Sequence, residues 1–133
     1  MARTHEDIER YILTSGIEYD QPGSGTWVLR DSSWGGAQIV VHHDEPLVIF
    51  RVKLIDLPAD LAQAVELTML RRLLTLNATE MLQGAYALEG RSVVAVEVMQ
   101  AENLDQNEFL AAVDTLTLAV EEHRDEFGRL LQS

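Results

Sequence analysis

The spacing of hydrophobic residues changes several times along the chain, and each change predicts an element of secondary structure. Between Ile8 and Ile12, apolar residues form a single stripe at helical spacing. Thr4 is a suitable N-cap for this helix, and Gly16 is well placed to end it. The segment DQPGSG, residues 20–25, is polar and rich in glycine, so we expect a loop there.

Three segments with alternating apolar and polar residues follow, which is the period of a strand with one buried face. They are separated by DSSWGG and DEP, both of which have the composition of turns. Consecutive strands joined by such short turns form an antiparallel meander. The predicted strands cover residues 26–30, 37–43 and 47–57.

A middle helix is predicted to begin near Pro58, a residue suited to the first helical turn, and to run to about Leu76. Asn77 tolerates the left-handed conformation, so we expect it to end this helix. The helix is apolar over so much of its circumference that a sheet on one side cannot cover it. Arg71 and Arg72 mark the narrow part left to water. One apolar side carries Leu61, Val65, Met69, Leu73 and Leu76, and another carries Leu67, Leu70 and Leu74.

The alternating pattern returns in GAYAL and RSVVAVEVM, which predict a hairpin over residues 84–99. Its turn is expected at Glu89 and Gly90, because glycine at the second loop position favours a short hairpin. In the second strand we expect Val94, Val96 and Val98 to point toward the core, with Glu97 pointing outward.

The last predicted helix begins with a capping box from Asp105 to Glu108 and continues to about Leu130. Its hydrophobic stripe is regular, and His123 occupies one position of that stripe. The order of elements is therefore α-β-β-β-α-β-β-α. This predicts a single α+β domain over residues 1–133, with one antiparallel sheet and helices packed on one face of it.

The charge of the chain narrows the choice of partners. Twenty-two acidic residues against ten basic ones give a net charge of −12. Such a surface repels phosphate backbones and anionic lipids, so we expect neither nucleic acid nor membrane as a partner. The charged N-terminus lacks the apolar run of a signal peptide, and no segment is long enough for a membrane helix, so a cytoplasmic location is expected. The acidic face of the last helix is interpreted as a solvated surface rather than a docking site.

The sequence contains no motif for catalysis or for binding a metal or cofactor, and we predict none of these. It has no cysteine and no nucleophile elbow. His42 and His43 are neighbours on a strand, so they face opposite ways, and we expect a solvated hairpin tip rather than a metal site. His5 is expected in an exposed first turn. For His123 two interpretations stay open: a partly buried imidazole, or a residue at the edge of the stripe that bonds to water or a nearby acid.

The segment from residue 58 to residue 130 resembles the C-terminal half of the YbjN-type family of bacterial sensory-transduction regulators. The shared features are a helix that ends in a Leu-x-Asn step near Asn77, a short glycine hairpin, a Leu-Asp helix start at Leu104 and Asp105, and a final amphipathic helix. That family in turn resembles the class I type III secretion chaperones. The resemblance implies a homodimeric, non-enzymatic protein that binds other proteins, and it provides no catalytic residue.

Two surfaces are candidates for these contacts. The over-apolar middle helix predicts a homodimer interface at Leu67, Leu70 and Leu74, because a two-fold interface would cover an otherwise exposed apolar patch. A second set of residues is expected to accept a protein partner as an extended peptide, and it consists of Trp34, Val28, Val40, Arg51 and Lys53. Trp34 could equally fold back over its own hairpin.

Two alternatives to a chaperone remain open. A small-molecule binder or enzyme would use a pocket between sheet and helices, which would need polar groups converging on it. An adaptor in a signalling pathway would differ from a chaperone only in the identity of its partner.

Overall fold

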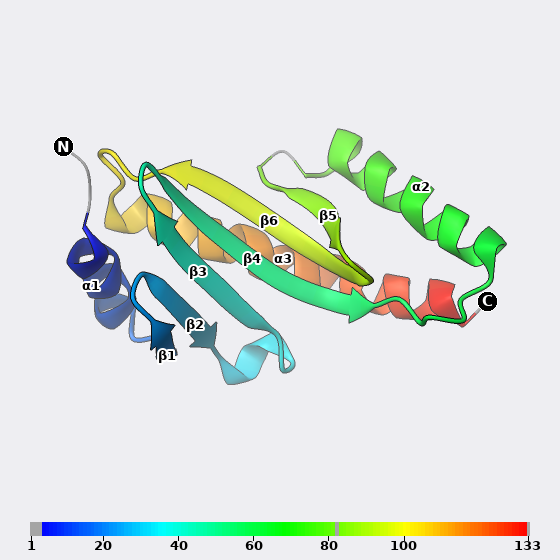
Figure 1. The fold of residues 1–133 in the computed structure, drawn as a ribbon, viewed down its shortest axis with the longest axis horizontal. Coiled ribbons are helices and arrows are strands. Elements are labelled where there is room, and N and C mark those ends of the chain that lie inside the picture. Colours follow the sequence, from blue (N-terminus) through cyan, green and yellow to red (C-terminus); the bar gives the residue numbers. More distant parts are fainter. Residues whose placement is uncertain (1–3, 82, 133) are drawn as a thin grey trace.

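The computed structural model describes residues 4–81 and 83–132, which form one antiparallel sheet with helices on one side (Figure 1). The six strands lie in the order β1-β2-β3-β4-β6-β5. This confirms the predicted α+β fold class. The helices are α1 (His5–Ser15), α2 (Gln63–Thr79) and α3 (Gln106–Leu131), with a short 3-10 helix η1 (Ser32–Trp34); the strands are β1 (Glu18–Gly23), β2 (Thr26–Arg30), β3 (Gln38–Asp44), β4 (Leu47–Asp56), β5 (Ala85–Glu89) and β6 (Ser92–Gln100).

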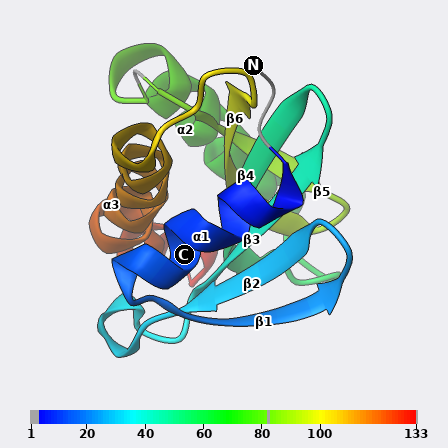
Figure 2. The same ribbon diagram turned by 90° about the vertical axis from the view of Figure 1, so that its left-hand side faces the viewer.

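The long helix α3 runs along one face of the sheet and provides most of the core on that side. Phe109 of α3 packs edge-on against Phe50 of β4, with ring centroids 5.1 Å apart, and both are fully buried. Figures 1 and 2 show α1 at the β1–β2 end of the sheet and α2 beside β5 at the other end. The Tyr11 hydroxyl of α1 donates to the Leu104 carbonyl at 2.6 Å and so joins α1 to the start of α3. Both predicted N-terminal capping boxes, at Thr4 and Asp105, are present.

Strand β1 is an element that the sequence pattern did not predict. The segment expected to be a loop pairs with β2 instead, with Glu18 opposite Arg30 and Asp20 opposite Val28. The strand is almost wholly exposed, so it lacks the alternation that marks a half-buried strand. It forms the edge of the sheet, where Pro22 is tolerated because an edge strand has backbone groups with no neighbour to bond. Arg30 of β2 contributes ion pairs to both Glu18 and Asp20.

The middle helix differs from the prediction at both ends. It begins at Gln63 rather than near Pro58, after a turn in which Leu61 N–H donates to the Pro58 carbonyl. It continues past Asn77 to Thr79, so the prediction that Asn77 ends the helix in a left-handed conformation is wrong. Asn77 instead bonds sideways to strand β5, a role described below.

The hairpin of β5 and β6 is present, but it is shifted from the prediction. The two loop residues are Gly90 and Arg91, because Glu89 is already paired with Ser92. In β6, Val93 and Ala95 point into the core. The predicted inward set, Val94, Val96 and Val98, therefore lies on the opposite face, and Glu97 shares the parity of Val93 and Ala95. Both faces of this central strand are apolar, which is why alternation alone could not orient it.

Candidate protein-binding surfaces

The face of the sheet opposite α3 is not covered by any described helix. Its residues alternate with the core residues of each strand, and most are half-buried by their neighbours alone. Val98 on this face is 48% exposed. The strand register aligns side chains into rows that cross the sheet, and the central row consists of Val28, Val40, Arg51, Val96 and Ala85. We call these five residues the open-face row.

The structure brings together four of the five residues predicted to contact a partner. Val28, Val40 and Arg51 belong to the open-face row, and Lys53 extends from the same face one step along β4. The basic side chains are already paired. Arg51 Nε lies 3.2 Å from Glu89 Oε1, and Lys53 Nζ donates to Asp56 at 3.0 Å. The open-face row is therefore apolar except for Arg51 at its midpoint, and the two basic side chains have acidic partners within the chain.

The fifth predicted contact residue, Trp34, lies elsewhere. It sits in η1, half-buried against the core and against α3, where it lines a cleft of about 430 Å³ together with Val120 and Thr117. Arg124 of α3 holds the same turn by donating to the Gly35 carbonyl at 2.8 Å. Trp34 is thus partly buried against α3 rather than folded over its own hairpin, and the accessible part leaves its role as a contact residue a prediction.

The outer side of α2 forms a second uncovered apolar surface. Its inner side is buried through Met69, Leu73 and Leu76. Two of the predicted interface residues are prominent on the outside, with Leu67 51% exposed and Leu74 70% exposed, and the third, Leu70, is half-buried. We call Leu67, Leu70 and Leu74 the α2 outer stripe. The chain does not enclose its own middle helix.

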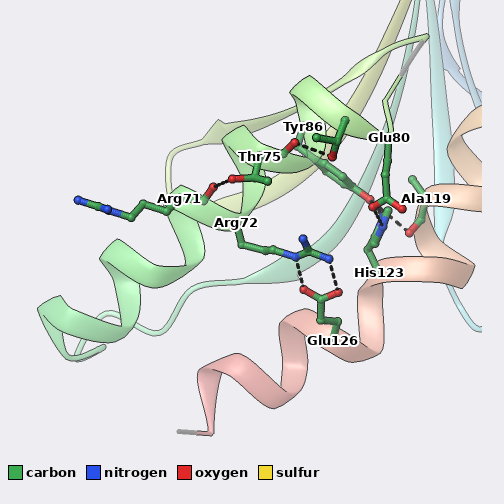
Figure 3. Close-up of polar contacts among 9 residues, drawn as sticks. Arg71, Arg72, Thr75, Glu80, Tyr86, Ala119, His123 and Glu126 are labelled. Carbon is green, nitrogen blue, oxygen red and sulfur yellow. Dashed lines mark hydrogen bonds and ion pairs between the residues drawn. The ribbon is translucent and has the colours of Figure 1, made fainter.

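Polar contacts hold α2 against α3 and β5 (Figure 3). Arg72 donates to both carboxylate oxygens of Glu126 on α3, at 2.6 and 3.0 Å, while Arg71 points away. These hydrogen bonds from Arg72 hold the pKa of the Glu126 carboxyl below its usual range. Asn77 accepts from Tyr86 N–H at 2.7 Å and donates to the Tyr86 carbonyl at 3.1 Å, so its side chain takes the place of a further strand beside β5.

His123 is buried, at 5% exposure, and it bonds on both sides. Its Nδ1 lies 2.5 Å from the Tyr86 hydroxyl and its Nε2 lies 3.3 Å from Glu80. Burial, followed by nearby carboxylates, raises the pKa of Tyr86, so the hydroxyl keeps its proton, for which His123 Nδ1 and the Ala119 carbonyl at 3.4 Å are both acceptors. In the tautomer with the hydrogen on Nε2, His123 accepts from Tyr86 and donates to Glu80. The structure thus combines the two interpretations left open from the sequence: the imidazole is buried, and it is bonded to an acid.

The other histidines separate as strand geometry requires. His42 is exposed on the open face, where its Nδ1 lies 2.8 Å from the Thr26 hydroxyl. His43 faces the helices and is only 6% exposed, so the expected solvated tip is wrong for this residue. Its partners are His5 and Glu45. The sequence contained no signal for this contact, because His5 and His43 belong to distant elements.

In the part of the chain that the structure describes, no three histidine or acidic side chains come together in a way that would hold a metal ion. No helix among the described residues is sufficiently long and apolar to span a bilayer. Other clefts among these residues are open to solvent, such as one of about 350 Å³ beside Val40 and Lys53 on the open face.

Comparisons with known proteins identify the fold and the family. Solved structures with the same fold include a chain of the heterodimeric ExoU–SpcU complex from the type III secretion system of Pseudomonas aeruginosa, with a TM-score of 0.61 and 20% identity over 94% of this chain and 95% of that chain. The ExsC–ExsE complex contains another, with a TM-score of 0.64 and 14% identity over 98% and 97% of the two chains. A third is found in the Yersinia pestis type III secretion chaperone SycH in complex with a stable fragment of YscM2, with a TM-score of 0.63 and 10% identity over 88% and 96%.

A search of curated protein sequences gives no match. The model of one protein family matches residues 1–133, and on that match this chain belongs to the CesT_Tir_1 family of type III secretion chaperones.

Proposed function

We propose that this protein is a homodimeric chaperone that holds an extended segment of a type III secretion substrate on the open face of its sheet, without catalysing a reaction. The family match supports a chaperone that binds protein. The observation that carries the proposal is the open-face row, a strip of four apolar side chains and Arg51 across five strands that no described helix covers. An extended peptide lying parallel to the strands would match this face, because its alternate side chains repeat about every 6.6 Å, which is the spacing between successive rows.

The composition of the surface indicates the kind of segment that would bind. The charged groups on the face, Arg51 and Lys53, are paired within the chain. A bound segment would therefore gain mainly from burying apolar side chains against Val28, Val40 and Val96. Because the protein carries a net charge of −12, a segment with basic flanks would also be attracted to it at long range.

Capture from the source bacterium followed by mass spectrometry tests this function. The wild-type protein is expected to retain a secretion substrate, and Val40→Asp is expected to reduce that recovery at least tenfold, because it places a charge at the centre of the open-face row. Ala111→Asp adds the same charge at an exposed position of α3 and should retain the partner. Equal capture by wild type and Val40→Asp would contradict the proposed surface, while a captured signalling protein would favour a regulator of the YbjN type.

The rival interpretation, a small-molecule binder or enzyme, has less support from the same geometry. The side chains between sheet and helices are apolar and buried, as the packing of Phe50 on Phe109 illustrates. The buried polar groups that do occur there, such as His123, are engaged with neighbouring side chains. A ligand site would need polar groups directed at an enclosed space.

A further inference from the structure

Three side chains connect the start of α1 to the end of β3. His5 Nδ1 lies 2.7 Å from His43 Nδ1, and the two rings meet edge to face with centroids 4.7 Å apart. On the far side of its ring, His43 Nε2 lies 2.7 Å from Glu45 Oε2. His43 is 6% exposed. We call His5, His43 and Glu45 the histidine latch.

His5 is an exposed residue, as the sequence predicted, and one side of its ring lies against the sheet. It lies edge-on to the buried ring of Trp27, with centroids 6.0 Å apart. A Cβ atom added to Gly25 would come within 2.8 Å of His5 Cε1, so only glycine leaves room for the imidazole here. His43 N–H in turn donates to the Gly25 carbonyl at 2.8 Å. The facing nitrogens are therefore held in contact by the surrounding backbone.

A hydrogen bond between two imidazole nitrogens is compatible with only some protonation states of the two rings. One nitrogen must carry the hydrogen and the other must offer its lone pair. With both rings neutral, His43 Nε2–H donates to Glu45 and His5 Nδ1–H donates to His43 Nδ1. A first additional proton can be accommodated, because a charged His43 donates to Glu45 and to His5. A second additional proton leaves two N–H groups facing each other with no acceptor between them.

Among the described residues, few charged groups lie where they could offset that second charge. Glu45 is the carboxylate in direct contact with the histidine pair, and its hydrogen-bond partner is His43. Within α1, Asp7 is engaged by Thr4 and Arg10, while Glu6 is exposed. Strands β2 and β4 present Trp27 and Val48, which do not titrate. The loop before α3 carries the exposed Glu102, and His42 lies on the opposite face of the sheet. His5 also stands in the first turn of α1, where the helix dipole disfavours positive charge.

We propose that the histidine latch is a proton-operated catch that fastens the first turn of α1 to the sheet near neutral pH and releases it in mildly acidic medium. The released state binds one more proton than the fastened state, so falling pH favours release. Ile8 and Ile12 of α1, which are fully buried, would become more accessible when the histidine latch opens.

Hydrogen exchange of the full-length protein tests the histidine latch. Exchange is measured by mass spectrometry and corrected for intrinsic exchange rates. Protection of the α1 amides should fall as the pH drops from 7.5 to 5.0, by at most about tenfold per pH unit, because release takes up one proton. Amides of β4 should keep their protection over this range. His5→Asn should remove the pH dependence, because an amide group can turn to either donate to or accept from His43 in each of its protonation states.

His42→Asn is the matched control, since it removes a neighbouring histidine on the other face of the sheet and should retain the full pH dependence. Three results would overturn the proposal: α1 protection that does not change with pH in the wild type, a fall that His5→Asn leaves intact, or a parallel loss in β4, which would indicate acid unfolding of the whole domain.

Discussion

At the scale of single residues, several polar side chains inside this protein connect elements of the fold to one another. Asn77 illustrates this most directly. Strand β5 is at the edge of the sheet, so the outward N–H and carbonyl of Tyr86 have no neighbouring strand. The amide of Asn77 has the same donor and acceptor as a backbone peptide, and it bonds to both groups. Unpaired backbone groups at this partly buried site would destabilise the fold.

Asn77→Ala is therefore expected to lower the free energy of unfolding by about 2 kcal/mol, since two partly buried hydrogen bonds are lost. Urea denaturation at pH 7 measures this change. Thr79→Ala provides the control, because that hydroxyl is exposed and bonds only to the Thr75 carbonyl of its own helix; its effect should stay within about 0.5 kcal/mol. An Asn77→Ala protein as stable as the control would show that water replaces the amide at no cost.

At the scale of elements, α2 is attached to the domain on one side, by three buried apolar residues, by the Asn77–Tyr86 hydrogen bonds and by the Glu66–Arg91 and Arg72–Glu126 pairs. The Arg72–Glu126 pair carries a pH dependence. The pair is partly exposed, with 37% and 28% of the two side chains accessible, so its contribution is modest. The direction in which the stabilisation by this pair changes with pH is nevertheless fixed. Because hydrogen bonds to Arg72 lower the pKa of Glu126 in the folded protein, the pair stabilises above the unfolded carboxyl pKa and loses its effect as pH falls through the folded value.

Glu126→Gln should accordingly reduce the free energy of unfolding at pH 7 by up to about 1 kcal/mol. The difference from wild type should shrink toward zero as pH falls below about 4, where the wild-type carboxyl is itself protonated. Urea titrations at several pH values provide the measurement, and Glu121→Gln, an exposed acid on the same helix, is the control. A difference that stays constant between pH 7 and pH 3 would rule out the charge of Glu126 as its cause.

Elements with a strong pattern could be predicted from the sequence, and those whose form depends on a neighbour could not. The caps at Thr4 and Asp105 and the alternation in β2 to β4 are local signals, and the structure confirms them. Strand β1 escaped prediction because it has no buried face. The orientation of β6 could not be predicted, because apolar residues between Val93 and Val98 lie on both faces of the strand. Only the packing of α3 determines which face is buried. Contacts such as His5 to His43 join residues that no sequence periodicity relates.

At the scale of the whole molecule, the protein combines a strongly acidic surface with two uncovered apolar areas, the open-face row and the α2 outer stripe. The acidic character of the surface follows from the net charge of −12. The two areas lie on different elements, one on the sheet and one on a helix beside its edge. A protein that used the stripe to pair with a second copy would leave both of its open faces free for a substrate.

This arrangement leads to a prediction for the oligomeric state. With Leu67 and Leu74 half or more exposed on one side of α2, the wild-type chain of 14.9 kDa is expected to sediment as a dimer at micromolar concentration. Leu74→Glu should shift it to a monomer, because the charge would be buried at a two-fold interface beside its own copy. Leu13→Glu is the matched control, as Leu13 is 60% exposed on α1 and lies outside the stripe.

The same variants distinguish dimer formation from substrate binding. If the α2 outer stripe is the dimer interface, Leu74→Glu should change the sedimentation coefficient while leaving the folded sheet intact, as judged by far-ultraviolet circular dichroism. A wild-type protein that stays monomeric, or a Leu74→Glu protein that stays dimeric, would reject the stripe as the interface. Substrate capture by the Leu74→Glu monomer would then show that one open face is sufficient to hold the segment, because that face is built entirely from strands of a single chain.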